Sequence, residues 1–206
     1  MGRPERLTPA AIAAAALRLG DREGPAAMSM RRIAADLGCD PMALYRHFAN
    51  REALLDAVAD AALAGARDPG PAVPWDDRLR AITTEIRSCA LRHPGIAAHV
   101  AARPPLGEHG LRLGAGLFAA LTEAGLPASD VVRSSQALIA YLAAALAMSV
   151  RAGSRDARWE QVSRAVTGLP DGPPGDEMFA VGSDEQFGYG LRLLINGIRA
   201  EAAGRS

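Results

Sequence analysis

The segment Gly38–Arg51, with the sequence GCDPMALYRHFANR, gathers side chains that can bind a polyanion. The four residues Tyr45–Phe48 contain one of the chain's three Tyr, one of its four Phe and one of its four His. An arginine can hold guanine through two parallel hydrogen bonds, while tyrosine and histidine side chains can contact phosphate oxygens. These residue types at this spacing indicate contacts with the bases and the backbone of a nucleic acid.

Two helical patterns would position these side chains. Apolar residues recur at positions i, i+3, i+4 and i+7 within residues 29–38, and Gly38 is typical of the end of a helix. Asp40 before Pro41 then starts a short helix that we expect to reach about Phe48. A helix, a glycine-containing turn and a second helix form the helix-turn-helix layout, in which the second helix enters the major groove.

At 100° per residue, the short helix at 41–48 has two arcs with different side chains. One arc consists of Pro41, Leu44, Tyr45 and Phe48, and the other of Met42, Ala43, Arg46 and His47. We expect Leu44 and Phe48 to anchor the helix in the core, because a helix this short is not stable alone. The second arc would then face the base edges.

Each side chain on and around the outer arc has a candidate role. Arg46 can contact guanine in a bidentate way, and Met42 and Ala43 can touch thymine methyl groups. The candidate phosphate contacts are Ser29, Arg31, Tyr45, His47 and Arg51. A packed face of a small helical bundle is the alternative interpretation of the same pattern.

Composition favours an all-α fold. Hydrophobic residues make up 49% of the 206 residues and aromatic residues only 4%, so the core must consist mainly of Ala, Leu, Val and Ile, a mix that suits helix packing. Residues 153–182 are expected to form a long mobile loop with about one helical turn near 159–166. Helices are expected at about 9 to 20 or 24, 29–38, 41–48, 50–67, 76–93, 96–102, 108–124, 128–152 and 183–203. The 134–150 stretch is apolar nearly all round and should be buried on several sides.

Proline positions, charge and cysteine content indicate how the chain is divided and where it acts. The proline-rich segment DPGPAVP at 68–74 predicts a boundary between two units, 1–67 and 68–206. The 23 basic and 23 acidic residues balance overall, but residues 1–51 hold eight Arg against five acidic residues, which permits nucleic-acid binding at that end. Cys39 and Cys89 match neither a metal site nor a secreted disulfide framework. Without an apolar signal region or an uninterrupted membrane span, we expect a cytoplasmic protein.

Residues 28–60, MSMRRIAADLGCDPMALYRHFANREALLDAVAD, resemble the DNA-binding domain of TetR-family transcriptional regulators. The resemblance rests on Arg-x-Ile-Ala, Leu-Gly, Leu-Tyr-x-His-Phe and Asn-Arg-x-x-Leu-Leu in that order, and it departs from the family at Cys39 and Asp40. It implies an all-α homodimer that binds an inverted-repeat operator in double-stranded DNA, usually as a repressor. It also implies positioning contacts from Ser29, Arg31, Tyr45, His47 and Arg51, and specificity positions at Pro41, Met42, Ala43 and Arg46.

The resemblance further implies a division of labour between the two units. Residues 1–67 would form a three-helix helix-turn-helix DNA-binding domain, and 68–206 a helical domain for effector binding and dimerisation. Residues 93–132 and 187–198 resemble the tetracycline-repressor branch, in which a histidine chelates drug-bound magnesium, and His99 lies at the comparable place. Because Ala102 and Arg151 stand where polar and acidic partners are expected, we predict no metal site.

The C-terminal unit would hold an apolar effector cavity with a few polar groups. The candidate ligand contacts are Trp75, His93, His99, Phe118, Tyr141 and Met148, each of which suits core packing equally well. No cofactor is predicted besides a small-molecule effector of unknown identity. Helices 128–152 and 183–203 would pair with their copies in the dimer, with small residues such as Gly188, Gly190 and Ala144 allowing close approach.

Two alternative functions stay open. One is a dimeric DNA-binding regulator without a ligand, and the other is a small all-α enzyme that uses the C-terminal cavity. The chain has no glycine-rich phosphate loop, His-x-x-x-His pair or nucleophile signature, so we predict no catalytic residue. Arg3 and Arg6, which precede the first helix, could enter a minor groove as an arm or lie in solvent.

Overall fold

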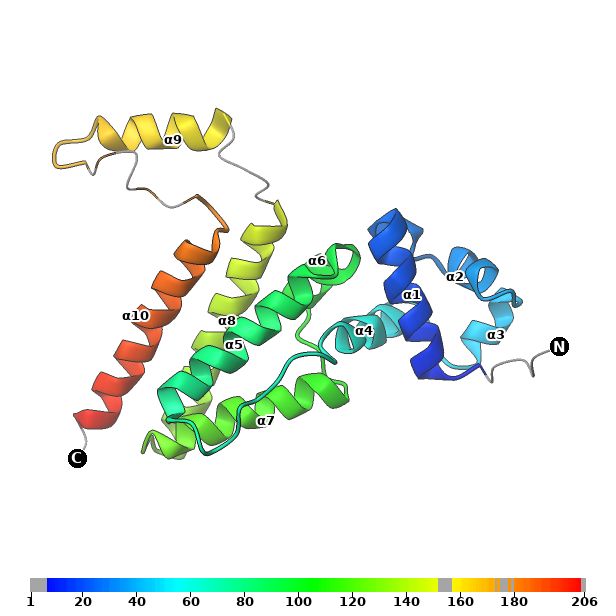
Figure 1. Cartoon of the computed structure of the whole chain (residues 1–206), viewed down its shortest axis with the longest axis horizontal. Helices are drawn as coiled ribbons and strands as arrows, with labels where there is room; N and C mark the ends of the chain where they lie inside the picture. The colour runs from blue at the N-terminus through cyan, green and yellow to red at the C-terminus, as the bar shows by residue number, and fades with distance from the viewer. Residues whose placement is uncertain (1–6, 152–156, 173, 175–177, 179, 205–206) are drawn as a thin grey trace.

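The computed structural model describes residues 7–151, 157–172, 174, 178 and 180–204, and every regular element among them is a helix. The α-helices are α1 (Pro9–Glu23), α2 (Met30–Asp36), α3 (Pro41–Tyr45), α4 (Arg51–Ala62), α5 (Trp75–Leu91), α6 (Pro94–Ala102), α7 (Glu108–Glu123), α8 (Ala128–Arg151), α9 (Ala157–Thr167) and α10 (Asp184–Ala203), and a short 3-10 helix covers Pro25–Ala27 (Figure 1). The all-α prediction is confirmed.

Side-chain caps start several helices where the sequence predicts them. The capping residues, each of which accepts a hydrogen bond from a backbone N–H two or three residues later, are Thr8, Ser29, Asp40, Asn50 and Ser183. Such caps satisfy N–H groups that have no partner in the first turn of a helix. Gly38 has a φ of +64° in the turn between α2 and α3, a conformation that favours glycine.

The largest differences from the predicted helices are at α3, α4 and α9. α3 ends at Tyr45 rather than Phe48, because the His47 N–H bonds to the Leu44 carbonyl in a tight turn that carries Phe48 into the core. α4 ends at Ala62 rather than near residue 67, because the chain after it forms turns in which an N–H bonds to the carbonyl three residues earlier. The expected loop at 153–182 contains α9, which has 11 residues rather than one turn, since residues 157–167 contain neither Gly nor Pro.

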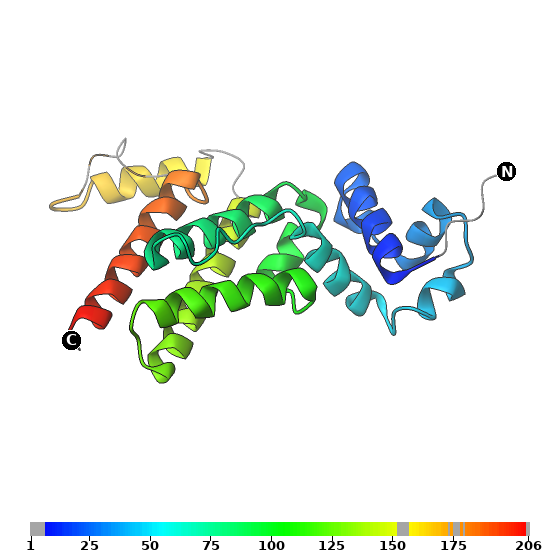
Figure 2. The same cartoon turned by 60° about the horizontal axis from the view of Figure 1, so that its bottom comes forward.

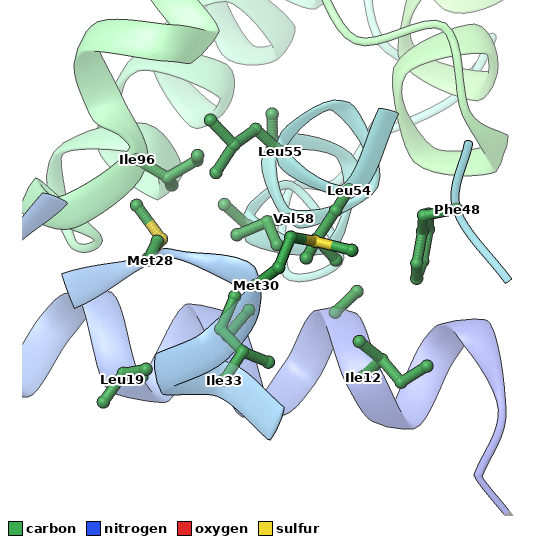
Figure 3. Packing of buried hydrophobic residues seen from close by; sticks show 14 of the residues in the cluster. Ile12, Leu19, Met28, Met30, Ile33, Phe48, Leu54, Leu55, Val58 and Ile96 are labelled. Carbon is green, nitrogen blue, oxygen red and sulfur yellow. The ribbon is translucent and has the colours of Figure 1, made fainter. Parts of the chain in front are cut away.

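The helices form an elongated molecule with α1–α3 at one end and α10 at the other (Figures 1 and 2). Helices α1–α4 enclose one hydrophobic cluster, which Ile96 of α6 also joins (Figure 3). Leu146 of α8 belongs to the same cluster. Where α1 meets α6, a Cβ on Gly95 would lie 2.5 Å from the Gly20 backbone, so the two helices pack in direct contact. A second cluster holds α5, α7, α8 and α10 together.

Helix α8 is buried along one face only in the single chain, rather than on several sides. Its buried residues are Val131, Ser135, Leu138, Leu142, Ala145 and Leu146. Ala140, Ala144 and Val150 on the same helix are exposed. By length and composition α8 could cross a membrane, but it packs against α5, α6, α7 and α10, as a helix inside a bundle does. Gly190 of α10 lies against Tyr141 of α8 in the same chain, where a Cβ would be 2.3 Å from the tyrosine oxygen.

Candidate nucleic-acid interface and ligand cavity

Two buried side chains anchor the short helix α3 to the N-terminal core. Leu44 is 0% exposed and Phe48, just beyond the helix, is 7% exposed, as the arc analysis predicts. Asp40 caps the helix, and Pro41 at its first position fixes a helical backbone angle. The helix has only five residues, so its position is set by these anchors rather than by its own stability.

The anchors leave a polar and apolar surface on α3 facing solvent. Met42 is 65% exposed and Tyr45 is 46% exposed, and Arg46 and His47 are also exposed. Pro41 is half-buried. The structure thus leaves Met42, Tyr45, Arg46 and His47 accessible to a partner.

Ala43 departs from this arrangement. It is 7% exposed, so its predicted place on the outer arc is wrong. α3 packs against α2, and its neighbours cover Ala43 as well as Leu44, which is more of the helix than the two-sided division assumes. A methyl group this deeply covered is not available at the surface for contact with a base.

The flanking candidate residues hold the helices around α3 as well as facing outward. The Ser29 hydroxyl accepts a hydrogen bond from the Arg32 N–H at 3.3 Å and so caps α2. Arg51 at the start of α4 donates from Nε to the Met28 carbonyl at 2.9 Å, which ties α4 to the chain before α2. Arg31 is exposed on the first turn of α2.

Two ion pairs reduce the positive charge elsewhere on this unit. Arg22 pairs with Asp36 at 2.8 Å, and Arg32 pairs with Glu23 at 2.8 Å. Both pairs join α1 to α2. Exposed pairs of this kind contribute little to stability. Arg31, Arg46 and Arg51 are exposed beside α3, where their charges would favour an anionic partner.

The second candidate site is a cavity of about 410 Å³. It lies between the residue after α4, helices α5 and α6, the loop at 103–107, and helices α7 and α8. The residues around it are glycines and Ala, Val, Leu, Ile, Pro and Phe only, so none of the described lining side chains can form a hydrogen bond. Leu106, Leu111 and Phe118 are exposed at this cavity.

Of the six candidate ligand contacts, only Phe118 lines the cavity. His93 bonds to Asp21 of α1 at 2.8 Å, and His99 to Asp56 of α4 at 2.7 Å, so both imidazoles link α1 or α4 to the C-terminal helices. Trp75 packs against the second hydrophobic cluster, and Met148 is half-buried outside the lining.

Tyr141 is likewise occupied inside the fold. Its hydroxyl donates to the Phe187 carbonyl at 2.7 Å, and its ring stacks on the Phe187 ring with centroids 5.8 Å apart. Burial raises the pKa of Tyr141. The expectation of a cavity with a few polar groups is therefore replaced by an apolar one.

Helix α7 supplies more of the unpredicted lining residues than any other helix. The stretch GLRLGAGLF places Gly110 and Gly114 four residues apart on one helical face of the lining. A Cβ on Gly114 would meet no atom within 4 Å, so the absence of a side chain there leaves space in the cavity. Small residues at this spacing are the signal that could have found the cavity.

The remaining predictions concern metals and the N-terminal arm. Among the described residues no group of three or more His, Cys, Asp or Glu side chains could hold a metal ion. Hydrogen bonds from Arg103 and then His99 lower the pKa of Asp56, so His99 serves an ion-pair network rather than an open site. Arg3 and Arg6 lie outside the described residues.

Comparisons with known proteins agree with both units. Residues 12–58 match the family of bacterial regulatory proteins called tetR, and residues 69–202 match the tetracyclin repressor-like C-terminal domain. An HTH-type transcriptional regulator of Saccharopolyspora erythraea is 32% identical over 205 residues, which cover 95% of this chain and 86% of the relative. The class A tetracycline repressor from transposon 1721 of Escherichia coli is 30% identical over 201 residues, covering 94% of this chain and 91% of that one.

Solved structures show the same fold. The Streptomyces coelicolor TetR family protein ActR in complex with actinorhodin superposes with a TM-score of 0.83 at 26% identity, covering 98% of this chain and 99% of ActR. Mycobacterium smegmatis BioQ gives 0.71 at 29% identity, covering 94% and 99%, and BioQ has also been solved with its double-stranded DNA operator. The chain therefore belongs to the TetR family of bacterial regulatory proteins, which are DNA-binding regulators of transcription.

Proposed function

We propose that this chain is a homodimeric repressor that binds an inverted-repeat operator through α3 and leaves it when a small molecule occupies the cavity. The observation that carries the proposal is the exposure of Met42, Tyr45, Arg46 and His47 in and just after α3, a helix fixed by the buried Leu44 and Phe48. A rigid short helix with an outward polar surface suits insertion into a major groove.

Within this proposal the residues divide by the part of DNA that they contact. Arg46 would contact a guanine, and Met42 a thymine methyl group. Pro41 lies in the reading surface, which comprises the candidate DNA contacts in residues 29–51. Tyr45, His47, Arg51, Arg31 and Ser29 would contact phosphates. Ala43 would act through packing, because it is buried.

The dimer would form through α8 and α10, which leave an apolar surface uncovered in the single chain. Val132 of α8 and Tyr189 and Leu193 of α10 are exposed, and exposed apolar and aromatic side chains are typical of an interface. Ala144 and Gly188 are exposed small residues on the same helices, whereas Gly190 already serves the packing within the chain. A two-fold dimer places its half-sites about 34 Å apart or somewhat more.

The effector is inferred to be an uncharged and largely apolar molecule. A charged or strongly polar group would lose its hydration in the cavity without gaining a hydrogen bond from a lining side chain, at a cost of about 2 kcal/mol or more. The tie between His99 and Asp56 speaks against a metal chelate as ligand. The likeness to ActR, solved with actinorhodin, supports the use of this region for a ligand.

The proposal assigns residues 1–67 to DNA binding and 68–206 to ligand binding and dimerisation, in a cytoplasmic protein that is not an enzyme. All named relatives above are regulators, and the cavity lining offers no acid, base or nucleophile among the described residues. Turnover of a compound that binds in the cavity would overturn the assignment as a regulator alone.

Selection of DNA from a random-sequence library tests the proposal without knowledge of the operator. The full chain should enrich sequences with two-fold symmetry, and a gel shift should show one complex that contains two chains. Enrichment without symmetry, or none at low salt, contradicts it. DNA binding that no neutral apolar compound weakens would favour the ligand-independent regulator instead.

A further inference from the structure

Helix α7 begins without a cap of its own, and a carboxylate from α4 takes the place of one. The N-cap residue of α7 is Gly107, which has no side chain to accept a hydrogen bond. Asp60 Oδ2 accepts from the N–H of His109 at 3.2 Å, and Oδ1 from the N–H of Gly110 at 2.8 Å. These are the second and third residues of the helix, whose N–H groups an N-cap side chain ordinarily satisfies.

Asp60 and Gly107 fit each other closely. Asp60 is 8% exposed, and a Cβ on Gly107 would lie 2.4 Å from its Cγ, so the carboxylate fills the space of the missing cap side chain. A negative charge is favourable at the N-terminus of a helix, which supports this arrangement electrostatically. A serine at position 107 could cap α7 locally, but not together with Asp60.

The same turn of α7 forms part of the wall of the cavity. Gly110, which donates to Asp60, also lines the cavity, and the loop residues Pro104–Leu106 line it just before the helix begins. Gly110 packs against the Pro105 carbonyl so closely that a Cβ would lie 2.0 Å from its oxygen. An occupant that displaces this loop must therefore displace the first turn of α7 as well.

Helix α4 connects the carboxylate to the reading surface. Leu54, Leu55 and Val58 of α4 pack in the N-terminal cluster beside Met30 and Ile33 (Figure 3). At its first residue α4 also holds the Met28 carbonyl through Arg51. A shift of α4 thus reaches α2 and, through it, α3.

We propose that Asp60 is a positioning residue that transmits occupancy of the cavity to the reading surface by fastening the first turn of α7 to α4. The inference rests on the proposed function, in which the N-terminal unit binds DNA and the cavity takes the effector. Asp56, one turn earlier on α4, instead bonds to His99 and Arg103 at the end of α6, so the two carboxylates hold opposite flanks of the loop at 103–107.

Two variants separate transmission from stability. Asp60→Ala removes the link and leaves the first turn of α7 uncapped. Adding Gly107→Ser places a hydroxyl in the vacated space and restores a local cap that has no bond to α4. The double variant should regain the thermal stability lost in Asp60→Ala, while the connection between the units stays broken.

Amide hydrogen exchange at residues 108–112 reports the connection in the full chain, with and without saturating DNA selected by the wild type. DNA binding fixes α4 and should slow exchange there about fivefold or more in the wild type, and less than about twofold in the double variant. Asp56→Ala, which keeps the α7 cap, should respond as the wild type does.

Three results would overturn the inference. Amide exchange at residues 108–112 of the wild type could be unchanged by DNA, the double variant could slow its exchange on DNA binding as much as the wild type, or Asp56→Ala could lose the slowing as the double variant does. DNA binding itself is measured first. If the wild type enriches no DNA, the proposed function fails and this inference falls with it, whereas DNA binding without a response in α7 overturns the inference alone.

Discussion

The reading surface and the cavity are both built from helices, but they draw on the sequence in different ways. The residues of the reading surface come from one stretch, 29–51, where caps and a glycine turn set three helices in order. The cavity takes its lining from α5 to α8 and the chain just after α4, residues more than 80 positions apart. The first site presents polar groups outward on buried anchors, and the second encloses apolar surface. A local pattern can therefore specify the first site, whereas only the assembled fold specifies the second.

Loss of a single anchor should damage the reading surface most. Leu44→Ala leaves a cavity under α3 and should lower the free energy of unfolding by about 2–5 kcal/mol, with loss of DNA binding. Leu111→Ala at the exposed edge of the ligand cavity should change it by about 0.5 kcal/mol or less. Chemical denaturation of both variants measures the difference. Similar losses in the free energy of unfolding would mean that the reading surface does not depend on its buried anchor more than the cavity depends on its exposed edge.

Filling the cavity should affect ligand binding and leave the reading surface intact. A Cβ on Gly114 meets no atom within 4 Å, so Gly114→Phe can place its ring in the cavity. The affinity for the neutral fluorescent probe N-phenyl-1-naphthylamine should fall by about tenfold or more, which corresponds to roughly 1.4 kcal/mol. The matched control is Thr122→Phe, an exposed position on α7 outside the lining, which should bind the probe like the wild type. Undiminished binding by Gly114→Phe would place the probe elsewhere.

The ion pairs between the two regions should contribute the smallest effect, and it should depend on pH. Hydrogen bonds from Arg103 and His99 lower the pKa of Asp56 in the folded chain. The stabilisation is therefore present above the pKa of the unfolded carboxyl, near 4, and is lost as the pH falls through the lower folded pKa. Because Asp56 is partly exposed, the contribution should be below about 1 kcal/mol.

Thermal unfolding between pH 6 and pH 3 checks this contribution. The wild type should lose slightly more stability than Asp56→Asn as the solution is acidified, since the amide cannot titrate. Parallel curves for the two proteins would show that the pairing with Arg103 and His99 does not stabilise the folded chain.

The sequence predicts the local structure around α3 well because its determinants are local. Ser29, Asp40 and Asn50 cap the helices that they precede, and Leu44 and Phe48 are buried as their spacing indicates. Ala43 is the exception, since how much of α3 its neighbours cover is a property of packing that a helical wheel does not contain.

Most of the predicted ligand contacts do not line the cavity, because aromatic and histidine side chains can also pack in the core or bond to other parts of the fold. His93 and His99 satisfy carboxylates on α1 and α4, and Tyr141 satisfies a carbonyl on α10, partners that are distant in sequence. The hydrogen bond from the Gly110 N–H to Asp60 could not be predicted from the sequence either, because nothing in the pattern of either residue indicates that a side chain of α4 caps α7.

Base-resolved DNA affinity of Arg46→Ala and His47→Ala tests the central assignment most directly. With the operator selected by the wild type and every single-base variant of it, Arg46→Ala should lose about 1–3 kcal/mol of discrimination at one base pair in each half-site. His47→Ala should weaken binding by a similar factor across all sequences and leave the preferences unchanged. If both variants alter affinity uniformly, or neither does, α3 does not read the operator in the way proposed here.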